Sequence, residues 1–179
     1  MGSLNPEPMT EEIQGRISKA AAFWPTLIFV YALDFITKRL VVNSLSPAYV
    51  PHRIIGDYVR FTLAYNRDAA MGLSLGDYSR AGFTITAAAV LVVLFALYRR
   101  TPASGLSSVI ALAMIAGGAL GNLTDRIQSS LGVVDFIDIG TKSVRFWTFN
   151  VADAAVTCGA ILLAVVSLRR DKTEQGAVP

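Results

Sequence analysis

Four apolar stretches, each long enough to cross a lipid bilayer, set the strongest limit on how this chain can fold. A helix rises about 1.5 Å per residue, so a stretch of about 18 residues spans roughly 27 Å, close to the thickness of the hydrocarbon layer. With 53% hydrophobic and 16% charged residues and a mean hydropathy of +0.50, the composition does not suit a soluble domain. We therefore expect an all-α integral membrane protein with four transmembrane helices.

The predicted organisation is a polar lead-in over residues 1–19, a membrane domain over 20–170 and a polar tail over 171–179. The lead-in is expected to be disordered or interfacial. The first apolar stretch does not resemble a cleaved signal peptide, because charged residues interrupt it and no clear small-x-small site follows. We expect helices over about residues 20–42, 81–98, 106–125 and 151–168.

The charge balance and the scarcity of cysteine and histidine argue against several classes of site. The formal net charge of +3 is better explained by lysines and arginines that flank membrane segments than by a nucleic acid partner. Cys158 is the only cysteine and His52 the only histidine, so neither a disulfide within the chain nor the usual His/Cys zinc site can form. We expect no cofactor and no metal.

Two connections are expected to be rich in β-structure. Residues 43–80 are too long for a plain turn, and residues 58–65 alternate between apolar and polar positions, which predicts a strand. Residues 133–139 and 144–149 flank Gly140, and we interpret them as a β-hairpin.

Four crossings of the bilayer gather the polar residues of the helices on one side of the membrane. The first helix ends on that side, the third arrives there and the fourth starts there, whichever way the protein is oriented. Residues three apart on a helix share a face, which groups the polar residues in pairs. Dense arginine pairs at 99–100 and 169–170 favour the opposite side as cytoplasmic. The gathered residues are Asp34, Lys38, Asn122, Asp125, Arg126, Asn150 and Asp153.

Asp135 and Asp153 are the leading candidates for proton chemistry. Both have apolar neighbours and no basic residue within four positions, so ionisation is costly at each. Two such acids brought together are the components of an aspartyl protease dyad. On spacing alone, a functional and a structural role remain equally open. Asp138 points to the opposite face of the predicted strand, and we expect it to be solvated.

Structural roles compete with functional ones at the other polar positions. Asp34 and Lys38 lie four residues apart, which suits a structural ion pair at a helix end. Asp125 adjoins Arg126, and a structural or orienting salt bridge is the favoured interpretation there. The asparagines of the third and fourth helices could simply hydrogen-bond between helices.

Five short segments, in order between residues 34 and 153, carry a family resemblance. On them the chain resembles signal peptidase II, the lipoprotein signal peptidase family of bacteria, over nearly the whole membrane domain. The segments are Asp34-Phe35-Ile36-Thr37-Lys38, Asn66-x-x-Ala69-Ala70, Gly117-Gly118-Ala119-Leu120-Gly121-Asn122-Leu123-x-Asp125-Arg126, Val133-Val134-Asp135-Phe136 and Phe149-Asn150-Val151-Ala152-Asp153.

The resemblance implies a membrane aspartic endopeptidase. Its substrate would be a prolipoprotein whose cysteine carries diacylglycerol, cut on the N-terminal side of that cysteine by water that the dyad Asp135 and Asp153 activates. It further implies a multi-pass protein of the bacterial inner membrane with both termini in the cytoplasm and the site near the outer leaflet. We expect a monomer among membrane lipids. The implied supporting residues are Asp34, Lys38, Asn66, Asn122, Asp125, Arg126 and Asn150.

The second of these segments departs from the family pattern at two positions. Asp68 stands where the family usually has glycine, and Met71 stands where it usually has phenylalanine. Aspartate tolerates left-handed backbone better than most residues, and methionine keeps apolar bulk with more flexibility than a ring.

Two other functions remain open beside the peptidase. One is a small transporter or proton-relay subunit, and the other is an inactive relative that binds lipopeptides.

Overall fold

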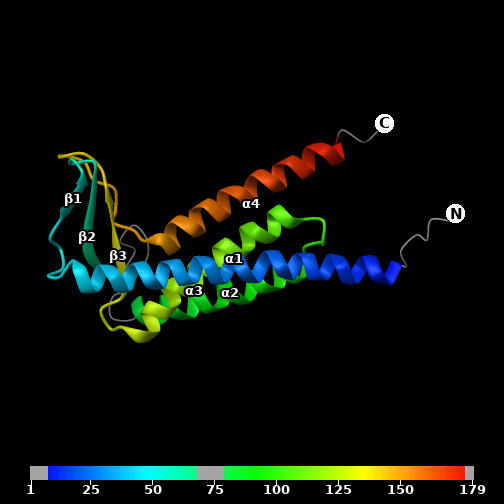
Figure 1. The fold of residues 1–179 in the computed structure, drawn as a ribbon, viewed down its shortest axis with the longest axis horizontal. Coiled ribbons are helices and arrows are strands. Elements are labelled where there is room, and N and C mark those ends of the chain that lie inside the picture. Colours follow the sequence, from blue (N-terminus) through cyan, green and yellow to red (C-terminus); the bar gives the residue numbers. More distant parts are fainter. Residues whose placement is uncertain (1–7, 68–78, 176–179) are drawn as a thin grey trace.

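In the computed structural model, which describes residues 8–67 and 79–175, four long helices form an elongated bundle with a small sheet at one end (Figure 1). All four helices are long and apolar enough to cross a membrane. The predicted class, a mostly helical membrane protein with a small β-rich part, is confirmed. The helices are α1 (Pro8–Ser44), α2 (Ser79–Arg100), α3 (Leu106–Gln128) and α4 (Val151–Gln175).

All four helices extend beyond their predicted bounds, α1 and α4 by the most. α1 begins at Pro8 rather than near Ala20, so much of the expected lead-in is helical. Proline suits this first position because its fixed φ matches a helix and its missing N–H would have no partner there. α1 also continues through Pro25, and α4 runs to Gln175 instead of ending near residue 168.

α3 is the central helix of the bundle, in contact with each of the other three. Glycines allow this close approach. A Cβ atom on Gly117 would lie 2.8 Å from the carbonyl oxygen of Leu27 in α1, and one on Gly118 would collide with the Ala152 carbonyl of α4. A Cβ atom on Gly121 would overlap a side-chain oxygen of Asp34. α3 can therefore hold α1 and α4 close enough for their polar groups to meet.

The sheet has three antiparallel strands in the order β1 (His52–Ile55), β2 (Val59–Asn66) and β3 (Val133–Ile139). The strand predicted from alternation over residues 58–65 is confirmed as β2. The predicted hairpin is confirmed in its antiparallel return, but its second arm is not a regular strand. β3 pairs with β2, and residues 144–149 return to it only through isolated bridges that involve Arg145 and Phe149. β1 was not predicted.

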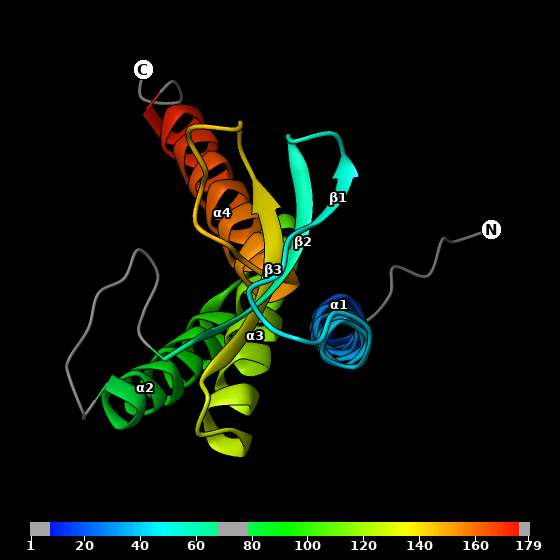
Figure 2. The same cartoon turned by 90° about the vertical axis from the view of Figure 1, so that its left-hand side faces the viewer.

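The sheet is anchored to the end of the bundle by its own apolar cluster. Val41 of α1 packs there with Leu63 of β2 and Phe136 of β3, all of them buried. Viewed from this end, β3 passes close to α3 and reaches toward the start of α4 (Figure 2). This packing brings the middle of β3 beside the first turn of α4, where the candidate residues lie.

Candidate active site

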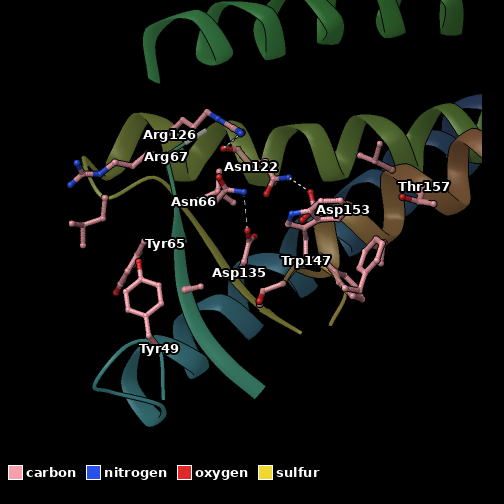
Figure 3. Close-up of a pocket in the computed structure, with 18 of the residues that line it drawn as sticks. Tyr49, Tyr65, Asn66, Arg67, Asn122, Arg126, Asp135, Trp147, Asp153 and Thr157 are labelled. Atoms are coloured by element: carbon pink, nitrogen blue, oxygen red, sulfur yellow. Dashed lines mark hydrogen bonds between the residues drawn. The ribbon is translucent and has the colours of Figure 1, made fainter. Parts of the chain in front are cut away.

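Asp135 and Asp153 line one cavity of about 1120 Å³ at the sheet end of the bundle. Asp135 comes from β3 and is 3% exposed, whereas Asp153 lies in the first turn of α4. Asn66 and Asn122 project toward the same space from β2 and α3 (Figure 3). The structure thus brings together side chains from four elements that are far apart in the sequence.

Asn150 and Asp153 form a reciprocal cap at the start of α4. The side-chain oxygen of Asn150 accepts from the Asp153 N–H at 2.9 Å, and Oδ2 of Asp153 accepts from the Asn150 N–H at 3.2 Å. This is the geometry of a capping box, in which the first and fourth residues satisfy each other's backbone donors. The cap fixes the position of the Asp153 carboxylate relative to the axis of α4.

Asn150 also holds the second carboxylate. Its Nδ2 donates to Oδ1 of Asp135 at 2.7 Å, while Nδ2 of Asn66 donates to Oδ2 at 3.1 Å. Asn150 is fully buried, so its amide is fixed by these contacts. One asparagine therefore bonds both acids, through its side chain to Asp135 and through its backbone and side chain to Asp153.

Asn122 connects Asp153 to a buried lysine. Nζ of Lys38 donates to Oδ1 of Asn122 at 2.9 Å, and Nδ2 of Asn122 donates to Oδ1 of Asp153 at 2.8 Å. An ammonium group can only donate, so it fixes which end of the amide faces it. The Asn122 amide is therefore obliged to present its N–H to Asp153.

Lys38 lies between two further acids. Its Nζ is 2.8 Å from Oδ2 of Asp34 and 2.9 Å from Oδ2 of Asp125, and both Lys38 and Asp34 are buried. The predicted Asp34–Lys38 ion pair is confirmed. The predicted pairing of Asp125 with Arg126 is wrong, because adjacent residues on a helix point in different directions and Asp125 turns toward Lys38.

The two acids beside Lys38 also bind backbone groups of the segments that carry the dyad. Oδ1 of Asp34 accepts from the N–H of Ala152 at 2.9 Å. Oδ2 of Asp125 accepts from the N–H of Val134 at 3.1 Å. These bonds attach the first turn of α4 and the start of β3 to α1 and α3. The cluster of Asp34, Lys38 and Asp125 supports the dyad through the backbone and through Asn122.

Burial is the main influence on the pKa of the Asp135 carboxyl group. Burial raises the pKa of Asp135 to about 7, the negative charge of Asp153 acts in the same direction, and the amides of Asn66 and Asn150 oppose them. A carboxyl group with this pKa exchanges its proton readily near neutral pH. Beside a second carboxylate, it provides an acid and a base in one cavity. No group of three metal-ligating side chains occurs among the residues that the structure describes.

Arg126, one of the supporting residues that the family resemblance implies, also lines the cavity. It donates from Nη1 to the Asn122 carbonyl at 3.3 Å. Four further residues that the sequence did not single out also line the cavity, namely Tyr49, Arg67, Trp147 and Cys158. Only their position in the fold reveals this role. Asp68 and Met71 lie outside the described residues.

Asp138 does not belong to this cavity, and its predicted solvation is wrong. It is 8% exposed, with Oδ1 accepting from Nε of Arg145 at 2.7 Å. Arg145 follows β3 after a turn and covers the carboxylate. Asp138 is therefore a buried structural partner on the other face of the sheet.

Comparisons with known proteins identify the family to which the chain is similar. The family model described as signal peptidase (SPase) II matches residues 26–169. A lipoprotein signal peptidase of Streptomyces coelicolor is 42% identical over 156 residues, covering 84% of this chain and 72% of the relative. One from Pseudomonas putida is 37% identical over 171 residues, covering 93% and 97%.

Solved structures show the same fold. A bacterial membrane enzyme determined by the in meso method superposes with a TM-score of 0.73 at 26% identity, covering 86% of this chain and 91% of that one. A second such enzyme gives a TM-score of 0.69 at 28% identity, covering 80% and 90%. With four apolar helices, a small sheet and a matching family model over most of its length, the chain belongs to the signal peptidase II family.

Proposed function

We propose that this protein is a membrane aspartic endopeptidase that removes the signal peptide from diacylglyceryl-modified prolipoproteins, cutting on the N-terminal side of the lipidated cysteine. The observation that carries the proposal is the placement of Asp135 and Asp153 in one cavity, both held by Asn150 through bonds of 2.7 and 3.2 Å. The relatives named lipoprotein signal peptidase supply the substrate class.

Asp153 is the proposed base. Its oxygens accept hydrogen bonds from the Asn122 amide and the Asn150 backbone N–H, and the N-terminus of α4 favours negative charge there. As the water oxygen bonds to the scissile carbonyl carbon, Asp153 takes one proton of that water. The result is a tetrahedral centre with the new hydroxyl group attached.

Asp135 is the proposed acid. Its pKa near 7 leaves it able to hold a proton at neutral pH, which it gives to the carbonyl oxygen as negative charge develops. The C–N bond then breaks, the leaving amine takes the proton held by Asp153, and the hydroxyl proton of the tetrahedral centre returns to Asp135 as the carboxylic acid product forms. Because the two acids share a proton across the cycle, their titration belongs to the pair.

The position of the cavity suits a substrate with acyl chains. Asp153 lies in the first turn of the α4 span, so the dyad sits at the edge of the hydrocarbon layer. Val156 and Trp147 provide apolar walls beside it. The acyl chains of the cysteine can stay in lipid while the scissile bond reaches the carboxylates and water enters from the sheet side.

We further propose a bacterial inner membrane location with both termini in the cytoplasm. Arg99 and Arg100 end α2 on the side opposite the dyad, which the positive-inside tendency assigns to the cytoplasm. The sheet and the dyad then face the outer leaflet. All residues of the site come from one chain, so a monomer is sufficient for activity.

The test is cleavage of a synthetic signal peptide with diacylglyceryl-cysteine by purified protein in detergent, with products identified by mass spectrometry. We expect one cut immediately before the lipidated cysteine and no cut in the same peptide with unmodified cysteine. Folded protein that binds the lipopeptide without cutting it would point to a binding function. Neither binding nor cutting would point to a transporter or proton relay.

A further inference from the structure

A second cavity, of about 450 Å³, lies at the end of the bundle opposite the dyad. It is formed where α2 approaches the N-terminal half of α1, away from the sheet (Figure 1). The rings of Phe23 and Tyr98 stack there with centres 4.0 Å apart and join the two helices. The side chains that line this cavity, which we call the basic pocket, are Arg16, Lys19, Trp24, Phe95, Tyr98 and Arg99.

The basic pocket lies at the boundary of the hydrocarbon layer. The apolar part of α1 begins at Ser18, and that of α2 ends at Arg100. Lys19 and Arg99 therefore meet where one apolar span begins and the other stops. The phosphate groups of lipids occupy this depth.

The charged side chains that line the pocket are all cations, and the contacts of Lys19 leave its charge in place. Nζ of Lys19 donates to the carbonyls of Thr101 at 2.6 Å and Arg99 at 3.3 Å, and it lies 4.7 Å from the centre of the Tyr98 ring. These partners are neutral. Among the described residues, no carboxylate forms an ion pair with Lys19 or Arg99. Arg16 lies one turn before Lys19, so like charges are gathered at a site that an anion would stabilise.

The remaining wall of the pocket is aromatic and open. Trp24 is 46% exposed and Phe95 is 43% exposed, both on helices that face lipid in a membrane. Such rings gather at the membrane interface, where one end contacts acyl chains and the other contacts polar groups. A ligand that fits both walls has an anionic head beside the three cations and apolar chains along the rings.

We propose that the basic pocket binds the phosphate of an anionic phospholipid, on the side of the membrane opposite Asp135 and Asp153. Basic pockets between transmembrane helices are a recurring form of lipid headgroup site. A bound lipid would tie the first turns of the α1 span to the last turn of α2. The proposal is independent of the peptidase activity, because none of these residues contacts the dyad cavity.

The experiment measures lipid binding to the purified full chain by native mass spectrometry and thermal shift. The probes are phosphatidylglycerol, phosphatidylcholine with the same acyl chains, and inorganic phosphate. We expect Arg16→Gln/Arg99→Gln to lose affinity for phosphatidylglycerol by roughly tenfold or more, since each cation near a lipid surface contributes about a factor of five. The matched control, Arg100→Gln/Arg169→Gln, removes two arginines at the same membrane surface but outside the pocket, and it is expected to lose clearly less affinity than the pocket variant.

Three results would overturn the proposal. An equal loss in the control variant would show only the general effect of charge. Equal binding of phosphatidylcholine would remove the role of the anionic head. Protection by inorganic phosphate as strong as that by phosphatidylglycerol would make the pocket a site for free anions.

A second measurement uses the intact pocket. The chain has two tryptophans, so Trp147→Phe leaves Trp24 as the only one. We expect phosphatidylglycerol with brominated chains to quench Trp24 fluorescence at lower lipid fractions than brominated phosphatidylcholine does. Identical quenching curves for the two lipids would contradict a specific site.

Discussion

Two pairs of acids lie close together at the sheet end of this protein, and the groups that bond directly to them differ in charge. Asp34 and Asp125 share one cation, with Lys38 within 2.9 Å of both. Asp135 and Asp153 are instead held by asparagine amides, and no described residue forms an ion pair with either of them. The first pair shares a direct ion pair with Lys38, whereas amides bond the second pair and the Arg126 guanidinium lies in the same cavity.

This difference explains how buried acids can stay reactive. A cation beside an acid favours its ionised form and removes it from proton chemistry at neutral pH. Amides position a carboxylate through directed hydrogen bonds without fixing its charge. The Lys38 cluster thus supplies rigidity, and in the proposed function the two other acids keep a proton that can move. Asn122 is the one side chain that bonds to both groups.

The largest effect is expected from changing the dyad itself. Asp135→Asn and Asp153→Asn keep the side-chain shape but remove the acid or the base, so the single-turnover cleavage rate should fall by roughly 10³–10⁴. Asp138→Asn is the matched control, because this buried acid lies outside the cavity, and it should retain the rate within about threefold. A dyad variant that cleaves at the wild-type rate would remove the basis of the proposed function.

Lys38→Met tests whether the other pair depends on its cation. The change leaves the buried Asp34 and the half-buried Asp125 beside each other without a counter-charge, which should destabilise the protein by about 3–5 kcal/mol. Thermal unfolding in detergent measures this. Adding Asp34→Asn and Asp125→Asn to Lys38→Met should restore much of the loss. If Lys38→Met unfolds at the wild-type temperature, the acids do not depend on the lysine.

Asn122→Ala tests the connection between the two pairs. Asp153 would lose one oriented donor, and we expect kcat to fall roughly 10- to 100-fold with little change in KM. Asn43→Ala, on the exposed end of α1, is the control for loss of an asparagine and should be neutral. A rise in KM at constant kcat would instead assign Asn122 to substrate binding.

The smallest effect concerns the dependence of stability on pH. The pKa of Asp135 rises from its ordinary value of 3.8 to about 7, so the folded state holds a proton that the unfolded chain has released. Asp135 therefore stabilises the fold least above pH 7. Asp135→Asn should gain stability relative to the wild type as pH increases from about 4 to 8.

Unfolding temperatures measured for the wild type and Asp135→Asn at each pH check this prediction. The difference between the two should increase steadily through the range and level off above pH 7. A constant difference, or one that shrinks with rising pH, would show that Asp135 is already ionised in the folded protein.

Local spacing predicted much of the fold and of the candidate site. Length and hydropathy gave the four helices, and alternation gave β2. The Asp34–Lys38 pair and the shared face of Asn150 and Asp153 follow from helical periodicity, which operates between neighbours in the chain. The convergence of the polar residues on one side followed from counting the crossings.

Contacts between segments that are distant in the chain could not be predicted from local spacing. The partner of Asp125 is Lys38, more than eighty residues earlier, and only the packing of α1 on α3 brings them together. The pairing of β3 with β2 has the same origin, because it joins segments that lie far apart in the chain. Asp138 was expected to be solvated because alternation along the strand does not show what covers its side chain. Arg145 covers it, and the position of Arg145 depends on the turn that follows β3.

The cap at the start of α4 has a consequence for turnover. Oδ2 of Asp153 closes the first turn of this helix by accepting from the Asn150 N–H. In the proposed reaction, Asp153 takes a proton, and a neutral carboxyl group accepts such a bond more weakly than a carboxylate does. Each catalytic cycle should therefore loosen and re-form the first turn of α4. The N-terminal end of this transmembrane helix would then fray once for each peptide bond that is cut.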